Sequence, residues 1–275
     1  MNPLAHQPWI FAGFAARVTL TVYACLVLLF LIAPLAVAVI LSFSGGPALT
    51  LPPPSWSVRW FLEAYRNEHF RTGFLNSIVI AASAAGIAAI AGTAAAIAIN
   101  HYQFRFRFAV QALVLAPLSL PGIALGLGIL FALPDYGLAP GSMATILGHS
   151  VLAIPYVCTM VLATLANYDV SLESASMNLG ATRLETFWRI TLPLVLPGTL
   201  AGAICGFLIS FDNVSVSLLT SSGNTLPLQL MQQIQFVADP SVAAVATMLI
   251  GLSLAVAFVV GFVAKRIGPS GLGML

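Results

Sequence analysis

The sequence predicts an all-α, polytopic membrane protein with about six transmembrane helices. The chain of 275 residues is 60% hydrophobic and 7% charged, with a mean hydropathy of +1.01, which is typical of a protein that resides in a bilayer. Long apolar runs recur along it, each near the ~20 residues that a helix needs to cross a ~30 Å hydrocarbon core. The runs are continuously apolar, which favours helices over a β-barrel because a helix satisfies its own backbone groups in lipid.

The predicted spans follow in chain order at roughly 18–43, 75–99, 108–133, 143–166, 192–211 and 242–264. The first begins after Arg17 and is too long for the core of a signal peptide, so we expect a retained helix, with a cleaved signal as the alternative. The longest segments between spans, at about 44–73, 167–191 and 212–241, are too short to build a core of their own. We therefore expect one transmembrane domain over residues 1–275, which borrows other activities from partners.

Basic residues predict the orientation, because cytoplasmic loops of membrane proteins are enriched in lysine and arginine. With both termini in the cytoplasm, the inner side holds Arg17, Arg105, Arg107, Arg183, Arg189, Lys265 and Arg266. The outer side then holds only Arg59, Arg66 and Arg71. The net charge of +2 is therefore a signal of topology, and we expect no nucleic-acid partner.

Small residues recur at every fourth position on three predicted helices, where they let backbones approach closely. These stripes are Gly198, Gly202 and Gly206; Ala88, Gly92 and Ala96; and Gly122 with Gly126. Packing within one subunit is the simpler interpretation of any single stripe, and a subunit interface is the alternative. Three stripes together indicate a compact helix bundle.

Prolines interrupt the later spans at Pro117, Pro121, Pro155, Pro193 and Pro197. Each removes a helix hydrogen bond and bends or breaks the helix. Such breaks line cavities in transporters and permit gating, although prolines also occur in inert membrane helices. Pro121 and Gly122 are therefore candidates for a substrate pathway.

Ionisable side chains are almost absent from the predicted spans. A carrier powered by protons or ions usually keeps buried charged groups, and here only Asp212, at the end of the fifth span, comes close. This disfavours a secondary carrier and implies an external source of energy.

His149 is expected to be a hydrogen-bonded packing residue, and adjacent Ser150 cannot serve as its nucleophile because neighbours face different sides of a helix. The three cysteines form no CxxC motif, and we expect them to be small buried residues: Cys25, Cys158 and Cys205. We predict no catalytic residue and no metal site in this chain.

Residues 167–191 form a polar, helix-forming insert between two apolar runs. Asp169 or Ser171 can cap a short helix, Gly180 can supply a turn, and the hydroxyl of Thr182 can cap a second helix. The apolar surface expected on this hairpin consists of Leu179, Leu184, Phe187 and Trp188. It can dock on a partner protein, or it can rest on lipid headgroups.

The insert resembles the EAA loop of bacterial ABC-importer permeases, which couples a membrane subunit to its ATPase. The matching residues, at the family's spacing, are Leu179-Gly180-Ala181, Phe187, Ile190, Leu192-Pro193 and Pro197-Gly198. The family's glutamate lies six residues before the glycine, where this chain has Ser174, and Glu173 lies one residue earlier, about 100° around the helix. The resemblance implies that residues 167–191 are a cytoplasmic coupling loop, with ATPase contacts at Glu173, Ser174, Ala175, Leu179, Gly180, Ala181 and Phe187.

Further segments resemble the polyamine branch of these permeases, and together they cover about residues 20–260. They are SVRWFLEAYRNEHFRTGFLNSIVIAA (57–82), PLSLPGIALGLGIL (117–130), SFDNVSVSLLTSSGNTLPLQL (210–230) and DPSVAAVAT (239–247). That branch commonly carries a second acid after the first, whereas Asn213 follows Asp212 here. The substrate pathway expected from these features includes Pro121, Gly122, Asp212 and Asn213.

The resemblance implies a type I importer permease in the bacterial inner membrane, surrounded by lipid. Its partners would be a second permease subunit, usually in a heterodimer, two ABC ATPase subunits below, and a periplasmic or extracellular substrate-binding protein above. ATP would be bound by the ATPase subunits, since this chain has no GxxxxGK[ST] run, and no cofactor is expected in the chain itself. Spermidine or putrescine is the leading cargo, with opines or other amino-acid derivatives, organophosphonates and ferric iron as alternatives.

Overall fold

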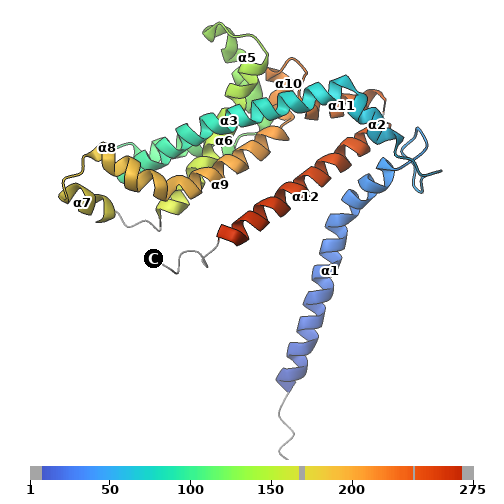
Figure 1. Cartoon of the computed structure of the whole chain (residues 1–275), viewed down its shortest axis with the longest axis horizontal. Coiled ribbons are helices and arrows are strands. Elements are labelled where there is room, and N and C mark those ends of the chain that lie inside the picture. The colour runs from blue at the N-terminus through green and yellow to red at the C-terminus, as the bar shows by residue number, and fades with distance from the viewer. Residues whose placement is uncertain (1–7, 167–170, 238, 268–275) are drawn as a thin grey trace, which may run out of the picture. The chain divides into compact units, whose positions relative to one another are not determined.

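The chain folds into helices joined by short connections (Figure 1). The computed structural model describes residues 8–166, 171–237 and 239–267. Extended residues pair in these ranges only at an isolated antiparallel bridge between Ser44 and Trp56. The predicted all-α fold is confirmed.

Two compact units make up the described chain. Unit 1 comprises residues 1–67 and 233–275, and unit 2 comprises residues 68–232. The single transmembrane domain expected over the whole chain stays a prediction.

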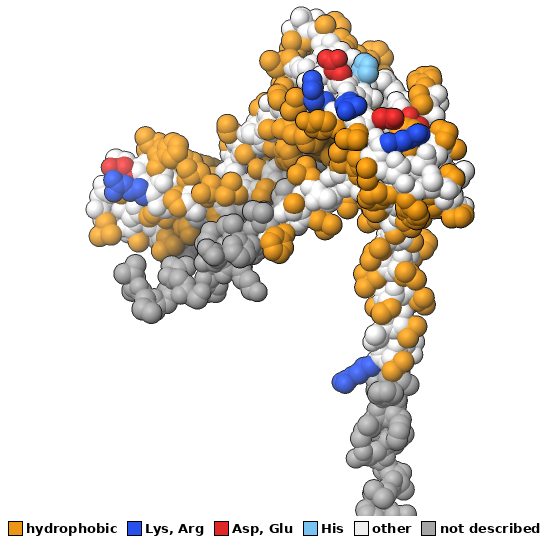
Figure 2. All heavy atoms as spheres, turned by 45° about the vertical axis from the view of Figure 1, so that its right-hand side comes forward, with side chains coloured by type: hydrophobic (Ala, Val, Ile, Leu, Met, Phe, Trp, Pro, Cys, Tyr) orange, Lys and Arg blue, Asp and Glu red, His pale blue; other side chains and the backbone are white. Residues whose placement is uncertain are grey.

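Unit 1 contains α1 (Pro8–Ser42), α2 (Arg59–Arg66) and α12 (Ser241–Ile267), and α12 packs against both other helices. Apolar side chains cover the described surface of α1, and none of its most apolar window is buried, as expected for a helix that faces lipid (Figure 2). Cys25 is exposed on this helix, so the expectation of three buried cysteines is wrong at that position.

Unit 2 contains the remaining elements: α3 (Glu68–His101), α4 (Arg107–Leu115), η1 (Ala116–Leu118), α5 (Gly122–Ala132), η2 (Leu133–Tyr136), α6 (Ser142–Leu165), α7 (Ser171–Asn178), α8 (Arg183–Thr186), η3 (Phe187–Thr191), α9 (Leu192–Phe211), α10 (Ser215–Thr220) and most of α11 (Leu226–Phe236). Its three long helices, α3, α6 and α9, run side by side and pack pairwise on one another (Figure 1). The hairpin of α7 and α8 lies at one end of α9, and α10 lies at the other.

The small-residue stripes explain this packing. A Cβ on Gly202 of α9 would lie 2.5 Å from the Cα of Val157, and one on Gly92 of α3 would lie 2.9 Å from the carbonyl oxygen of Ile154, both on α6. A Cβ on Gly126 of α5 would lie 3.2 Å from a backbone atom of α10. All three stripes therefore pack within the chain, which confirms the simpler interpretation.

The third predicted span, 108–133, is not one helix. The pair Arg107–Leu118 and Gly122–Tyr136 is bent by 107° at its break. Pro121 has extended backbone there (ψ 130°) and begins the second helix, so the predicted proline break is confirmed. By contrast, α6 and α9 continue through Pro155 and Pro197.

Within the described residues, four helices can cross a membrane by length and composition: Ala16–Ser42, Glu68–His101, Ser142–Leu165 and Arg183–Phe211. The bent pair makes five if it counts as one span. The sixth predicted span corresponds to α12, in which Ser241–Ala255 is a shorter apolar helix. The fifth span starts earlier than predicted, because a π-helical turn (η3) joins α8 to α9 without a break.

Candidate functional site

The predicted coupling loop is a helical hairpin over its described residues, 171–191. Gly180 takes the left-handed conformation at the turn (φ 96°), and the N–H of Ala181 donates to the carbonyl of Ser176 over 3.2 Å. Thr182 caps the second helix: its Oγ1 accepts from the N–H of Glu185 over 3.3 Å, and its own N–H donates to Glu185 Oε2 over 2.8 Å. The predicted turn and second cap are confirmed. The first helix begins at Ser171, and Asp169 lies outside the described residues.

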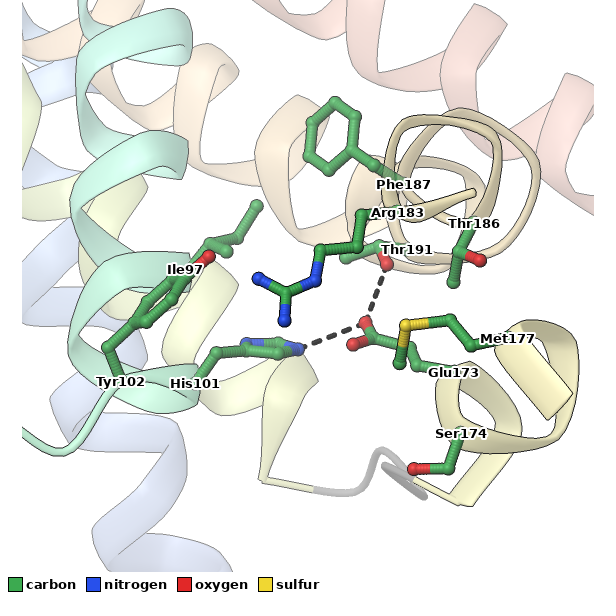
Figure 3. A pocket seen from close by; sticks show the side chains of 10 residues that line it. All are labelled: Ile97, His101, Tyr102, Glu173, Ser174, Met177, Arg183, Thr186, Phe187 and Thr191. Atoms are coloured by element: carbon green, nitrogen blue, oxygen red, sulfur yellow. Dashed lines mark hydrogen bonds and ion pairs between the residues drawn. The ribbon is translucent and has the colours of Figure 1, made fainter. Parts of the chain in front are cut away.

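Most of the apolar surface predicted on this hairpin is exposed. Leu179, Leu184 and Trp188 are 89%, 68% and 59% exposed. Phe187 is instead half-buried and packs its ring against that of Trp188, with centroids 5.5 Å apart. Phe187 is the least exposed of the four, because its side chain lines a pocket where the hairpin meets the end of α3 (Figure 3).

That pocket has a volume of about 340 Å³ and lies where the end of α3 meets the hairpin. It is lined by Ile97, His101, Tyr102, Glu173, Ser174, Met177, Arg183, Thr186, Phe187 and Thr191. The guanidinium of Arg183 points into it (Figure 3). Arg183 itself is exposed, so this pocket opens beside a basic side chain on the loop surface.

Glu173 faces the interior of the chain and joins three elements. Its Oε1 accepts a hydrogen bond from Thr191 Oγ1 over 2.5 Å and lies 3.0 Å from His101 Nε2 (Figure 3). The side chains of His101 and Glu173 are only 12% and 16% exposed, so this contact forms an ion pair largely shielded from water whenever the imidazole is protonated. Ser174 and Ala175, next along α7, are exposed. Of the three, Glu173 thus faces the bundle, and its neighbours face outward.

Sequence reasoning missed His101 and Thr191 as partners of Glu173. His101 is 72 residues away along the chain and Thr191 is 18 away. No local spacing rule pairs such positions. The one available signal was that His101 ends a long apolar run and stands next to a predicted cytoplasmic segment.

The predicted pathway residues meet at the start of α10. A Cβ on Gly122 would lie 3.0 Å from the Cβ of Ser215, which places the Pro121 break against this helix. Asn213 Oδ1 accepts from the N–H of Val216 over 2.8 Å and so caps α10. Asp212 ends α9 with an exposed side chain, and its carboxylate makes no hydrogen bond within the described residues.

His149 is the centre of a buried polar cluster next to α10. It is 1% exposed, its Nδ1 lies 2.7 Å from Ser210 Oγ on α9, and its Nε2 lies 3.0 Å from Ser217 Oγ on α10. Ser150 instead donates to the carbonyl of Ile146 in its own helix over 2.7 Å. His149 is therefore the hydrogen-bonded packing residue that the sequence predicts. In the part of the chain that the structure describes, no three His, Cys, Asp or Glu side chains cluster as a metal site.

Known proteins share both the sequence and the fold. Residues 88–269 match the profile of a family described as "Binding-protein-dependent transport system inner membrane component". The chain is 32% identical over 246 residues to the putrescine transport system permease protein PotI of Escherichia coli (strain K12), which covers 86% of this chain and 87% of that protein. It is also 32% identical over 203 residues to the spermidine/putrescine transport system permease protein PotC of Haemophilus influenzae, covering 73% of this chain and 78% of the relative.

Among solved structures, a chain of a bacterial ABC transporter involved in the import of the acidic polysaccharide alginate superposes with a TM-score of 0.67. The alignment covers 96% of this chain and 99% of that one at 16% sequence identity. At this identity the likeness concerns the fold alone.

Proposed function

The chain belongs to the family of binding-protein-dependent transport system inner membrane components, and from this premise we propose that it is the permease subunit of an ATP-driven importer of polyamines. Members of this family are multi-pass inner-membrane proteins that work with a substrate-binding protein. The chain would form half of the translocation pathway and contribute no ATP site of its own.

One observation carries the choice of cargo. Two separate permeases named for putrescine or spermidine match at 32% identity over most of this chain and of their own length. The exposed carboxylate of Asp212 lies at the end of α9, where the pathway residues meet, and it suits a cationic cargo better than an anionic one. Asn213 supplies no second carboxylate there, because its side chain caps α10.

The partners follow from surfaces that the chain leaves open. The exposed Leu179, Leu184 and Trp188 support docking of the hairpin on an ATPase subunit, with two ATPase copies in the assembly. A second permease subunit, forming a heterodimer with this one, would supply the other half of the pathway. In this arrangement both termini and the coupling loop lie in the cytoplasm, and the start of α10 lies toward the binding protein.

The mechanism we infer is alternating access. ATP closes the ATPase pair and brings the two coupling loops together, and the helix bundles then open outward to receive cargo from the binding protein. Hydrolysis reverses the movement.

Uptake of labelled putrescine and spermidine into proteoliposomes that hold the complete complex tests this proposal. We expect uptake that requires both ATP and the binding protein. ATP-driven uptake of an opine, an organophosphonate or ferric iron, with none of either polyamine, would overturn the cargo while leaving the family intact.

A further inference from the structure

Of the three long helices in unit 2, α3 is the one without an internal proline. It runs over 34 residues, Glu68 to His101. The 24 residue steps from Ser77 to His101 span roughly 36 Å at about 1.5 Å per step, which exceeds a hydrocarbon core of about 30 Å. A helix of this kind transmits a push along its axis, because its hydrogen-bond ladder is continuous.

The inner end of α3 is attached to the coupling loop. His101, its last residue, binds Glu173 of α7 at 3.0 Å, and the same carboxylate oxygen accepts from Thr191 at the start of α9. A second bond, of 3.0 Å between Ser176 Oγ and Thr186 Oγ1, joins the two arms of the hairpin. A displacement of the hairpin therefore acts on α3 directly.

The outer end of α3 is attached to the first residue of α11 and to the segment just before it. Ser77 Oγ accepts from the N–H of Leu226 over 2.9 Å, and Asn76 Nδ2 donates to the carbonyl of Asn224 over 3.1 Å. The backbones are in close contact there, since a Cβ on Gly73 would lie 3.2 Å from the Cα of Leu226.

The same end of α3 also touches the pathway region. Phe74 packs edge-on against Phe211, with ring centroids 6.0 Å apart, and Phe211 directly precedes Asp212. The outer end of α3 is thus in contact with the segment that carries the predicted pathway acid.

On the other routes from the loop to the outer end the regular backbone hydrogen-bond ladder is interrupted, although α6 and α9 remain helical throughout. The covalent route runs through the π-helical turn Phe187–Thr191 and then through Pro197 inside α9. Pro155 lies inside α6, and α4 and α5 are separated by the 107° bend. Each interruption removes or displaces backbone hydrogen bonds and so softens the helix.

We propose that α3 is a strut that carries movement of the coupling loop to residues 224–226 and to Phe211, with His101, Asn76 and Ser77 as positioning residues. This inference rests on the proposed function, because an ATPase must move the loop. It goes further in naming the helix, and the bonds at both of its ends, that transmit the movement.

A spin label on Ser222→Cys, an exposed position in the outer segment, tests the strut in the complete complex. Cys25, Cys158 and Cys205 are first replaced by alanine, and spectra are recorded with and without ATP and vanadate. We expect nucleotide to shift the label between two spectral states. His101→Ala and Ser77→Ala should each reduce that shift in equilibrium by about 2- to 30-fold, with the ATPase still bound.

Matched controls separate transmission from general damage. Tyr102→Phe removes a hydroxyl from the same pocket at an exposed residue, and Ser83→Ala removes one from the middle of α3; both should leave the response intact. His101→Gln and Ser77→Thr keep a hydrogen-bonding atom at each end and should restore most of it. The double variant His101→Ala/Ser77→Ala should be no worse than the stronger single one, because both act on one strut.

Three results would overturn the strut. They are an unsubstituted chain whose label spectrum does not change with nucleotide, a full spectral response in His101→Ala, and a double variant whose loss equals the product of the two single losses. Loss of the bound ATPase from His101→Ala would also count against it, by assigning this contact to docking. If the label responds as expected but no polyamine is taken up, the proposed cargo fails and the strut stands.

Discussion

At each of the two ends of unit 2, polar contacts join three helical elements, but the side chains that make these contacts differ. At the predicted coupling loop a carboxylate, Glu173, joins α7, α3 and η3, and the same hairpin exposes the apolar side chains of Leu179, Leu184 and Trp188. At the other end the imidazole of His149 joins α6, α9 and α10 through two serine hydroxyls, and the cluster is almost fully buried. The first arrangement can be moved by a partner that binds the loop, whereas the second depends on complete burial to hold α10 in place.

The largest effect is expected at the turn of the coupling loop. Gly180→Val should weaken the coupling of the ATPase to transport while membrane insertion stays intact, because Gly180 has φ 96° and a β-branched residue resists that conformation. A Cβ there would meet nothing within 4 Å, so the effect is conformational rather than steric. Uptake and ATPase co-purification measure it, and we expect a loss of about 5- to 30-fold, from about 1–2 kcal/mol of backbone strain.

Asparagine gives a matched control for this turn, since it tolerates the left-handed region. Gly180→Asn should retain most of the uptake. Full transport with normal ATPase stimulation in Gly180→Val would show that the turn geometry is dispensable, and the inner end would then be no more sensitive than the outer one.

Glu173 comes next, and its variants distinguish an internal contact from a docking contact. Glu173→Ala should lower coupled ATPase activity several-fold, by about 1–2 kcal/mol, and Glu173→Lys should lower it more, because lysine places a cation opposite His101. If the carboxylate acts through His101, then Glu173→Ala should add little in a His101→Ala background. An unchanged effect of Glu173→Ala in that background would instead support direct contact with the ATPase.

Sequence reasoning reached the class and the secondary structure because both depend on local or summed properties. Hydropathy predicted the long helices. Gly180 predicted the turn and Thr182 predicted the cap, because both features depend only on residues a few positions away. The bond between Glu173 and His101 depends on tertiary packing across 72 residues, and no local spacing rule pairs the two side chains. The same holds for Asn213, whose role as a cap became visible only once α10 was seen to begin two residues later.

The buried cluster around His149, at the α10 end of unit 2, should respond in stability rather than in coupling. His149→Leu leaves the hydroxyls of Ser210 and Ser217 without their shared partner, and we expect a loss of about 1–3 kcal/mol, seen as a lower melting temperature of the purified protein. Ser150→Ala is the control, since that hydroxyl bonds only within its own helix. Equal melting temperatures for both variants would contradict a structural role for this cluster.

The smallest effect is expected at Asp212, because its side chain is exposed whereas Glu173 and His149 are partly or fully buried. Asp212→Asn keeps the shape of the side chain and removes its charge, and the carboxylate makes no hydrogen bond within the described residues that this change would break. If the charge guides a cationic cargo, putrescine uptake should fall about 2- to 5-fold at low ionic strength, and less at high salt, because exposed charges are screened over about 10 Å at 0.1 M. Basal ATPase activity and assembly should not change.

Glu63→Gln, which neutralises another exposed acid on the predicted outer side, is the matched control and should leave uptake unaltered. Unchanged putrescine uptake by Asp212→Asn at low salt would exclude guidance, and the outer end would then act through packing alone.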